Sequence, residues 1–459
     1  MIYIFFNKIE RLLILLTLIT LSVTSIDAGT FQISGDDLKV ISVEPDKTTG
    51  LNKIYVVYDV TKVVATYTSN GTNSPIWYRY SNLGGGYAEE IQGIEHNGNV
   101  TSLKNIEGDM GYIIEDGTDR YYFWVVNYLD HRLDLKSVSP NNEQDCGSTN
   151  LLLTGSGDPI KYFTINGQQR ILDQQIKVVY NTLEWNDESK IWEQVECEES
   201  FESFSSSIYI TPAPLCNTIF SVRGDRFLEE WSWIQEVSSD IYYTNSIDAR
   251  TEAIQVQSDN DKSNQINSGS TGELGGSAPA DITFYSYVTD GIIHNEWQMT
   301  SDPDFEQITY RFTNQDFNYI FTEEGTLYVR YVGSNSDGSC EVYGDTYTVT
   351  IGASELKCPN AFSPNASEGV NDEWKVSYKS IIEFECWIYN RWGVEVCHFT
   401  DPEMGWDGKY RGKYVGSGVY YYIVRAKGAD GKEYKLSGDI NILNYNDRGN
   451  NMGEGSDQP

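Results

Sequence analysis

The sequence is poor in basic residues, in histidine and in local patterns of metal ligands. Its 459 residues contain 33 Lys and Arg against 67 Asp and Glu, which gives a formal net charge of −34 at pH 7. Contacts to phosphate need clustered cations, so this balance excludes a typical nucleic-acid-binding protein. No two of the seven cysteines form a Cys-x-x-Cys pair, and the four histidines lie far apart in the sequence. We therefore expect no metal ion and no cofactor.

Motifs for catalysis are also missing. The sequence has no Gly-x-Ser-x-Gly elbow, no His-Glu-x-x-His pattern and no glycine-rich loop that would hold a phosphate. We therefore predict that the protein is not an enzyme, and we assign no catalytic residue. The tripeptide Arg223-Gly224-Asp225 resembles an integrin-binding sequence, but it directly follows a strand-like run and we interpret it as an ordinary turn.

Long apolar segments are confined to the N-terminus. Lys8 and Arg11 precede the apolar run Leu12–Leu21, and small residues follow, with cleavage expected after Ala28 or Ser25. The run is short for a membrane span of ~30 Å, so residues 1–28 read as a signal peptide rather than as an uncleaved anchor. We therefore predict an exported protein with no transmembrane anchor after cleavage.

Aromatic residues are abundant, with 33 Tyr and 11 Trp, and this argues for a folded chain despite its charge. Short β-branched or aromatic runs recur between clusters of Gly, Asn and Asp, and no long segment has a clean helical period. These runs are Tyr55–Tyr58, Tyr121–Val126, Lys177–Tyr180, Thr346–Ile351 and Val419–Val424. The pattern predicts an all-β protein built from tandem immunoglobulin-like β-sandwich modules.

Changes in composition suggest the boundaries of the modules. Residues 257–279 are rich in Ser, Asn and Gly and contain few large apolar residues, so we predict a flexible linker there. The remaining predicted parts are an immunoglobulin-like module at 29–139, one or more β modules at 140–256, a compact sandwich at 280–353, a C-terminal domain at 354–446 and a polar tail at 447–459.

The sandwich at 280–353 has a recognisable motif. Trp297 lies early, and the run Tyr319–Arg330 ends in a strand that leads to Ser334-Asn335. This stretch resembles PKD and related immunoglobulin-like modules. The resemblance implies a role as a spacer or an adhesion element.

The C-terminal domain carries five ordered motifs. They are Pro359-Asn360-Ala361-Phe362-Ser363-Pro364 with Asn371-Asp372, then Asn390-Arg391-Trp392-Gly393, then Gly405-Trp406-Asp407-Gly408, then Ser417-Gly418-Val419-Tyr420, and a final glycine-rich hairpin. Together they resemble the gliding-motility-associated C-terminal domain, the type B sorting domain of type IX secretion cargo in Bacteroidetes. The resemblance implies export through the periplasm and outer membrane, with the type IX secretion machinery as partner, to the cell surface or the medium.

Two features depart from that family. The turn at residues 365–372 is longer than usual and lacks one acidic residue, which makes a complete calcium site doubtful. The chain also continues beyond the usual end with a polar tail.

Two cysteines flank the Asn390–Gly393 turn. If the turn has two residues, Arg391 and Trp392, then Cys386 lies directly opposite Cys397. We therefore predict a cross-strand disulfide between them, with two reduced core thiols as the alternative.

Several functions remain open for the exported modules. The preferred hypothesis is a non-enzymatic surface protein whose modules serve adhesion, binding or spacing, with a host or glycan ligand that the sequence does not identify. An alternative is a carbohydrate-binding or glycan-degrading region within 29–256, and a third hypothesis is a subunit of an extracellular filament. Burial of Trp77, Trp124, Trp185 and Trp297 in sandwich cores would favour the first hypothesis over the second.

Overall fold

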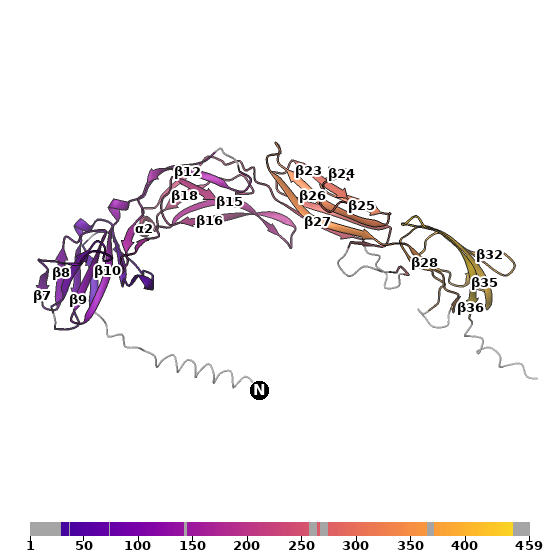
Figure 1. Ribbon diagram of the computed structural model, residues 1–459, viewed down its shortest axis with the longest axis horizontal. Helices are drawn as coiled ribbons and strands as arrows, with labels where there is room; N and C mark the ends of the chain where they lie inside the picture. The colour runs from indigo at the N-terminus through magenta and orange to yellow at the C-terminus, as the bar shows by residue number, and fades with distance from the viewer. Residues whose placement is uncertain are drawn as a thin grey trace, which may run out of the picture. The chain divides into compact units, whose positions relative to one another are not determined.

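The computed structural model describes residues 29–443, except Asp36, Asn73 and residues 142–144, 257–263, 267–273 and 365–370. The predicted signal peptide, the polar tail and most of the predicted linker therefore lie outside the described residues. The chain divides into two compact units, one with residues 1–182 and 195–243, the other with residues 183–194 and 244–459. Strands dominate both units, which confirms the all-β prediction (Figure 1). Among the described residues, no helix has the length and apolar character needed to cross a membrane.

The first unit begins with a two-sheet sandwich. Its strands are β1 (Thr30–Ser34), β2 (Ile41–Val43), β3 (Lys53–Val57), β4 (Val64–Thr68), β5 (Ile76–Tyr80), β6 (Glu89–Glu90), β7 (Glu95–Asn97), β8 (Val100–Lys104), β9 (Met110–Asp116) and β10 (Asp119–Asn127). One sheet has the order β1-β4-β8-β7 and the other β2-β3-β10-β9-β5-β6, in which β3 and β10 run parallel. Trp77 is buried in the core between the sheets, and its Nε1 donates a hydrogen bond to Thr101 Oγ1 at 2.9 Å.

Strand β10 is buried on both of its faces. Phe123 and Val125 point into the core of the first sandwich, whereas Trp124 and Val126 belong to a second cluster that continues into the following module. A strand buried on both faces has a continuous apolar run rather than an alternating one, which is the pattern of residues 123–126. The first two predicted modules therefore share a hydrophobic core within one unit.

The second module of this unit consists of three small sheets. They are β11 (Asp134–Pro140) with β12 (Thr149–Ser156) and β17 (Ser207–Ile210), β13 (Lys161–Phe163) with β14 (Gln169–Ile171), and β15 (Ile176–Asn186) with β16 (Ile191–Phe201), β18 (Ser221–Gly224) and β19 (Gln235–Ser238). Between β18 and β19 lies the short helix α2 (Arg226–Glu230). Because β11 already pairs with β12, this module begins slightly before the predicted boundary at residue 140.

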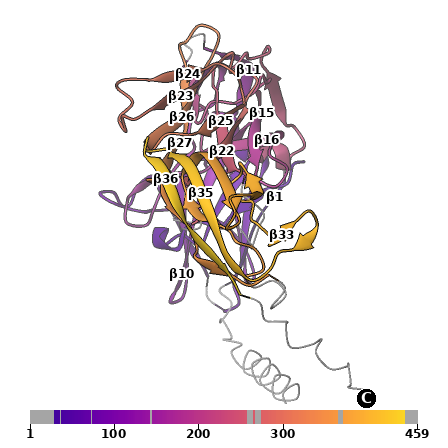
Figure 2. The ribbon, with the colours of Figure 1, turned by 90° about the vertical axis from the view of Figure 1, so that its right-hand side faces the viewer.

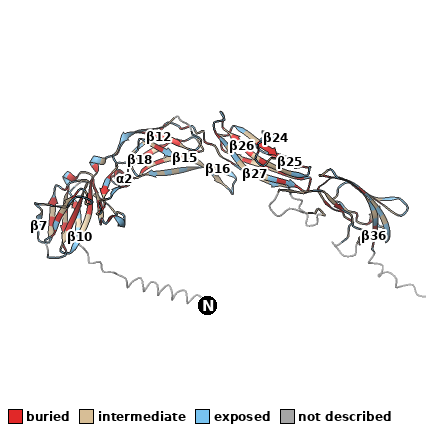
Figure 3. Ribbon diagram, viewed as in Figure 1, coloured by how far each residue is buried: buried red, intermediate tan, exposed pale blue. Residues whose placement is uncertain are grey.

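The second unit contains the predicted third sandwich. One sheet has the order β20 (Ala249–Gln255), β22 (Ala280–Val288) and β25 (Phe317–Phe321). The other has the order β21 (Leu274–Gly276), β27 (Glu341–Ile351), β26 (Gly325–Ser334), β23 (His294–Thr300) and β24 (Tyr310–Phe312). Trp297, Phe284 and Phe317 form the centre of the core between these sheets. Figure 3 shows how buried and exposed positions are distributed along the strands.

Two predicted boundaries around the linker are wrong. Strand β20 pairs with β22 of the third sandwich, although it was assigned to the preceding module. Strand β21, inside the predicted linker, runs parallel to β27, and the backbone N–H of Ile266 donates to Tyr378 O at 2.7 Å. Composition does not reveal this strand because a single apolar side chain, Leu274, packs against the core while backbone hydrogen bonds pair the strand with β27.

The C-terminal domain has one five-stranded sheet. Its order is β29 (Ala361–Phe362), β36 (Glu433–Ile442), β35 (Gly418–Gly428), β31 (Ile381–Tyr389) and β32 (Glu395–Phe399). Two short ribbons accompany it, β28 (Glu355–Lys357) with β30 (Ser377–Lys379) and β33 (Lys409–Tyr410) with β34 (Lys413–Tyr414). The core lies on one face of the sheet, against Trp374, Val376 and Trp406.

Ser380 links this domain to the third sandwich. Its hydroxyl donates to Gly352 O at 2.6 Å, and its backbone N–H donates to Ser277 Oγ at 2.7 Å. Ser380 is fully buried, so these hydrogen bonds are shielded from water.

Candidate functional site

The opening motif of the C-terminal domain contains β29, the strand at one edge of the sheet. Phe362 is buried and lies 5.4 Å from the Trp406 ring, while its strand β29 runs parallel to β36. The carbonyl of Asn360 accepts from Asn441 N at 2.9 Å, and that of Pro359 accepts from Trp374 Nε1 at 2.7 Å. These predicted site residues therefore act through packing and backbone contacts.

The Gly405–Gly408 motif pins a loop to the core. Trp406 and Trp374 exchange two backbone hydrogen bonds of 2.9 and 3.0 Å, and both rings are buried. Gly408 has φ +75°, and a Cβ there would lie 2.9 Å from Pro364 Cγ. Both the conformation and the space favour glycine at this position. Gly405 is similarly confined, because a Cβ would lie 2.6 Å from Lys375 Cγ.

Asp407 fixes the residue that follows the loop. Its carboxylate accepts from Lys409 N at 3.0 Å and forms an ion pair with Lys409 Nζ at 2.8 Å. Burial disfavours the charged carboxylate, but the hydrogen bonds from Lys409 outweigh it and lower the pKa of Asp407. Asn371, with φ +54°, accepts from Ser363 N at 3.0 Å, and Asp372 beside it is half-buried.

The hairpin between β31 and β32 has a three-residue turn. Asn390 N donates to Val394 O at 2.9 Å, so Arg391, Trp392 and Gly393 form the loop. Gly393 has φ +79°, as expected for the glycine of such a turn. The side chain of Asn390 accepts from Trp392 N and Val394 N at 2.9 and 3.0 Å, which closes the turn.

The predicted opposition of Cys386 and Cys397 is wrong. Cys386 lies opposite Phe399, and Cys397 lies opposite Ile388. The three-residue turn shifts the register by one residue, and an irregularity between Ile388 and Tyr389 shifts it again. Both cysteines are free thiols in the structure, as is Cys358.

These three thiols belong to the domain core. Cys386 is fully buried, and Cys358 and Cys397 are half-buried against the same cluster. Burial raises the pKa of Cys358 to about 11 and also raises the pKa values of the other two. At neutral pH all three are therefore protonated and poor nucleophiles.

The other face of the sheet is exposed, and none of the predicted site residues marks it. Trp387 and Tyr389 of β31 lie directly opposite Ile423 and Tyr421 of β35. Ile423 and Tyr421 are 42% and 48% exposed although β35 is an inner strand. Successive side chains of β31 and β35 point to opposite faces of the sheet, and both strands have apolar residues at consecutive positions. This pattern in the sequence could have predicted an apolar outer face.

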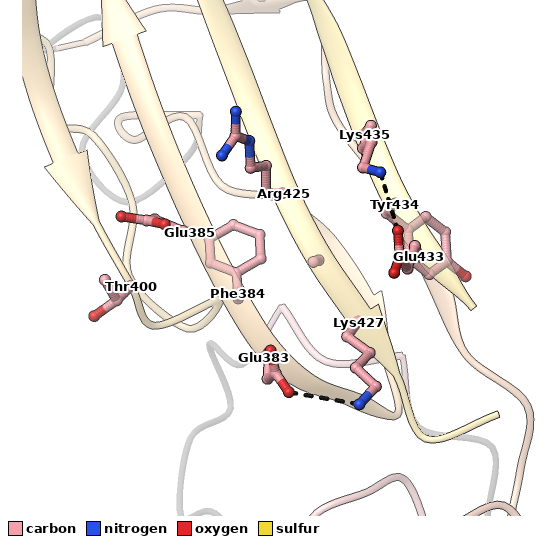
Figure 4. Close-up of a pocket in the computed structure, with 10 residues that line it drawn as sticks. Glu383, Phe384, Glu385, Thr400, Arg425, Lys427, Glu433, Tyr434 and Lys435 are labelled. Atoms are coloured by element: carbon pink, nitrogen blue, oxygen red, sulfur yellow. Dashed lines mark ion pairs between the residues drawn. The ribbon is translucent and has the colours of Figure 1, made fainter. Parts of the chain in front are cut away.

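On the same face, charged residues lie where β31 begins, β35 ends and β36 begins (Figure 4). Lys427 pairs with Glu383 at 3.7 Å, and Lys435 pairs with Glu433 at 3.0 Å. Together with Arg425 they line a shallow depression of about 520 Å³. The depression is lined by both signs of charge.

Metal ligands do not gather elsewhere in the described part of the chain. Within it, no group of three or more His, Cys, Asp and Glu residues could hold an ion. The calcium site considered from the sequence would lie in the turn at residues 365–372. Residues 365–370 of this turn lie outside the described residues.

The tryptophans named in the sequence analysis are mostly structural. Trp77, Trp124 and Trp297 are buried in cores. Trp185 is half-buried, with its ring 5.5 Å from Trp192 and 5.1 Å from Tyr287. None of the first three is available as a surface for a sugar ring.

In the Arg223-Gly224-Asp225 tripeptide, Gly224 and Asp225 are buried, whereas the Arg223 side chain is partly exposed. Arg223 and Gly224 end strand β18, and Asp225 is fully buried at the start of α2. Its carboxylate accepts hydrogen bonds from Tyr128, Gln174 and two backbone N–H groups of α2. An integrin could not reach this carboxylate without unfolding the site.

Two protein families match parts of the chain. Residues 356–442 match the family described as CHU_C Type IX secretion signal domain. Residues 137–239 match the fibronectin type III domain family. The chain is therefore an all-β protein with a type IX secretion signal domain and a fibronectin type III domain, classes that are typically non-catalytic. The signal domain indicates export to the cell surface or the extracellular space.

Searches among known proteins and structures add little beyond this. No curated protein matches the chain. A tetra-tandem repeat in the extending region of a large adhesion protein is 11% identical, with 90% of this chain and 100% of that chain covered and a TM-score of 0.24. Fibronectin(III)-like modules of Clostridium thermocellum CbhA are 13% identical, with 38% and 92% covered and a TM-score of 0.17. Dimeric latent PorU from Porphyromonas gingivalis is 8% identical, with 71% and 35% covered and a TM-score of 0.15. At such TM-scores these likenesses say nothing about function.

Proposed function

We propose that this is a non-enzymatic protein exported by the type IX secretion machinery, which handles the folded C-terminal domain as its sorting signal. The match of residues 356–442 to the secretion signal family carries the proposal. The five sequence motifs support it, because they build the turns, the loop and the sheet edge of a single small domain. A signal of this kind is a folded surface, so the motifs act chiefly by maintaining that surface.

The exported β modules then serve adhesion, binding or spacing. Their charge supports a role in the medium or at a surface, since residues 29–353 carry 49 Asp and Glu against 19 Lys and Arg. Such a net charge keeps the modules soluble and resists association between copies. Within 29–256, the burial of Trp77 and Trp124 favours this role over a glycan-binding region, whereas Trp185 is only half-buried.

Deletion of residues 354–459 tests the export step. We expect the shortened protein to accumulate in the periplasm and to be lost from the medium and the cell surface. Immunoblots of cell fractions measure this, with deletion of residues 444–459 alone as the control. Export of the 354–459 deletion at the wild-type level would contradict the proposal.

A point variant separates loss of the signal from loss of the whole protein. Trp374→Ala removes a fully buried ring from the C-terminal core and should destabilise that domain by about 3–5 kcal/mol. We expect it to reduce export while the third sandwich remains folded and resistant to protease. Trp297→Ala, with a ring buried in the third sandwich, is the matched control.

A further inference from the structure

Two turns of the C-terminal domain present cations beside exposed aromatic rings. The β31–β32 turn contributes Arg391 and Trp392, and Trp392 is 73% exposed. The β33–β34 ribbon contributes Lys409, Arg411, Lys413 and Tyr414, with Tyr414 53% exposed. We call these six residues the basic-aromatic tip. Figure 2 shows β33 and its turn projecting to one side of β35 and β36.

Shared contacts place the two turns near each other. Trp406 Nε1 donates to Lys409 O at 3.0 Å at the base of the β33–β34 ribbon, and its ring lies 5.1 Å from Tyr420. Tyr420 precedes Tyr421, which lies opposite Tyr389 at the end of β31, and strand β32, which leaves the first turn, contacts β33. The contact between Trp406 and Tyr420 therefore joins the base of the ribbon to the end of β31, where the first turn begins.

The cations of the tip rest on aromatic rings. The Arg391 guanidinium lies 4.1 Å from the centre of the Trp392 ring, and Lys409 Nζ lies 4.9 Å from that of Tyr414. Asp407 pairs with Lys409, but within the described residues no ion pair involves Arg391, Arg411 or Lys413. Two further carboxylates lie on neighbouring strands, Glu395 on β32 opposite Tyr389 and Asp439 on β36 opposite Tyr421. The tip thus keeps an excess of positive charge.

This tip contrasts with the rest of the chain. Residues 354–443 carry 11 Lys and Arg against 13 Asp and Glu, whereas residues 29–353 carry 19 against 49. An anionic surface therefore repels the preceding modules and attracts the tip. At physiological salt this attraction acts within about 8 Å, so the basic residues must come close to the surface.

We propose that the basic-aromatic tip binds the anionic lipid surface of a membrane. Exposed Trp and Tyr side chains partition to the level of the headgroups, while Arg and Lys keep their charges near the lipid phosphates. Projecting turns can enter a fluid surface without a complementary cavity, which distinguishes this site from a protein interface. The inference goes beyond export, and its test does not depend on export, because vesicle binding is measured on the purified protein.

Vesicle sedimentation of the mature chain, residues 29–459, tests this proposal. We expect binding to vesicles of phosphatidylcholine and phosphatidylglycerol in equal amounts, little binding to phosphatidylcholine alone, and release by added NaCl. Arg411→Gln with Lys413→Gln should weaken binding about 30-fold, at roughly 5-fold for each cation near an anionic surface. Trp392→Ala should weaken it further without changing the salt dependence.

The control removes the same charge elsewhere in the domain. Lys427 and Lys435 lie at the depression on the exposed face of the sheet. The double variant Lys427→Gln with Lys435→Gln should leave vesicle binding within 2-fold of the wild type. Equal losses in both double variants would show general electrostatic adsorption and would overturn the site. Equal binding to neutral vesicles would overturn it as well.

Two further outcomes distinguish other ligands. If inorganic phosphate releases the protein more effectively than chloride at equal ionic strength, the tip is a phosphate site rather than a lipid-binding surface. If the Arg411→Gln and Lys413→Gln variant loses export but binds vesicles normally, the tip serves the secretion machinery and the lipid proposal fails. Normal export with lost vesicle binding supports it, whatever the deletion of residues 354–459 shows.

Discussion

Asp225 shows how one side chain joins the parts of the first unit. Its carboxylate accepts from Tyr128 Oη at 3.1 Å, from Gln174 Nε2 at 3.2 Å and from the backbone N–H groups of Phe227 and Leu228. It therefore caps α2 and satisfies polar groups from two other segments, and it is fully buried. The last residue of the Arg-Gly-Asp tripeptide is thus a central structural acceptor.

We predict that Asp225→Ala lowers the free energy of unfolding of the first unit by about 3–5 kcal/mol, because two side-chain donors and the helix cap lose their acceptor. Calorimetry of the full chain should show one transition at a lower temperature. Asp46→Ala removes the exposed cap of the 3-10 helix at Lys47–Thr49 and should have a much smaller effect. Equal effects in the two variants would contradict the role of Asp225.

The pH dependence of this site has a defined sign. Burial raises the pKa of Asp225 above its usual range, and the hydrogen bonds from Leu228, Tyr128 and Gln174 oppose this only in part. The folded state then binds the proton more tightly than the unfolded state, so this contribution to stability falls as the pH rises above about 4. We expect the melting temperature of the wild type minus that of Asp225→Asn to decrease with pH. If this difference in melting temperature rose with pH, the folded protein would stabilise the charged carboxylate, and the predicted direction of the pKa shift would be wrong.

At the scale of the element, the β31–β32 hairpin shows how a turn sets a register. The Asn390 side chain and the left-handed Gly393 select a three-residue loop, and the loop length then decides which residues of β31 and β32 meet. The irregularity after Ile388 adds a second shift. Cys386 and Cys397 consequently occupy diagonal rather than opposite positions, where a disulfide fits poorly.

We predict that Gly393→Ala lowers the melting temperature of the C-terminal domain by about 4–8 °C. A Cβ at Gly393 would meet nothing within 4 Å, so the loss reflects the positive φ alone, at about 1 kcal/mol. Gly416→Ala is the control, because Gly416 is equally open and lacks a positive φ. A similar loss in both variants would show that the backbone conformation of the turn is not the cause.

At the scale of the whole molecule, charge separates the C-terminal domain from the modules before it. The near balance of charge within residues 354–443 allows this domain to meet a partner or a surface that would repel the acidic modules. The acidity of the modules keeps their open sheet edges apart. Such edges include β16 and β24, each at the end of its sheet.

We predict that the protein associates near the isoelectric point of about 4.4 expected from its sequence. Protonation of the carboxylates removes the repulsion between copies, so exposed edges and apolar faces come into contact. Light scattering should rise near this pH and fall again at neutral pH. Scattering that stays flat between pH 3 and 7 would show that charge does not keep the copies apart.

The amino-acid sequence alone was enough to predict the all-β fold class, because alternating runs and turn residues are local signals. The order of motifs such as Asn390–Gly393 and Gly405–Gly408 was enough for a resemblance to type IX sorting domains. The burial of Asp225, the strand within the predicted linker, the register around Cys386 and the exposed tip became visible in the folded chain alone. Each of these depends on backbone pairing or on contacts between distant segments, and a single residue of turn length changes every pairing beyond it.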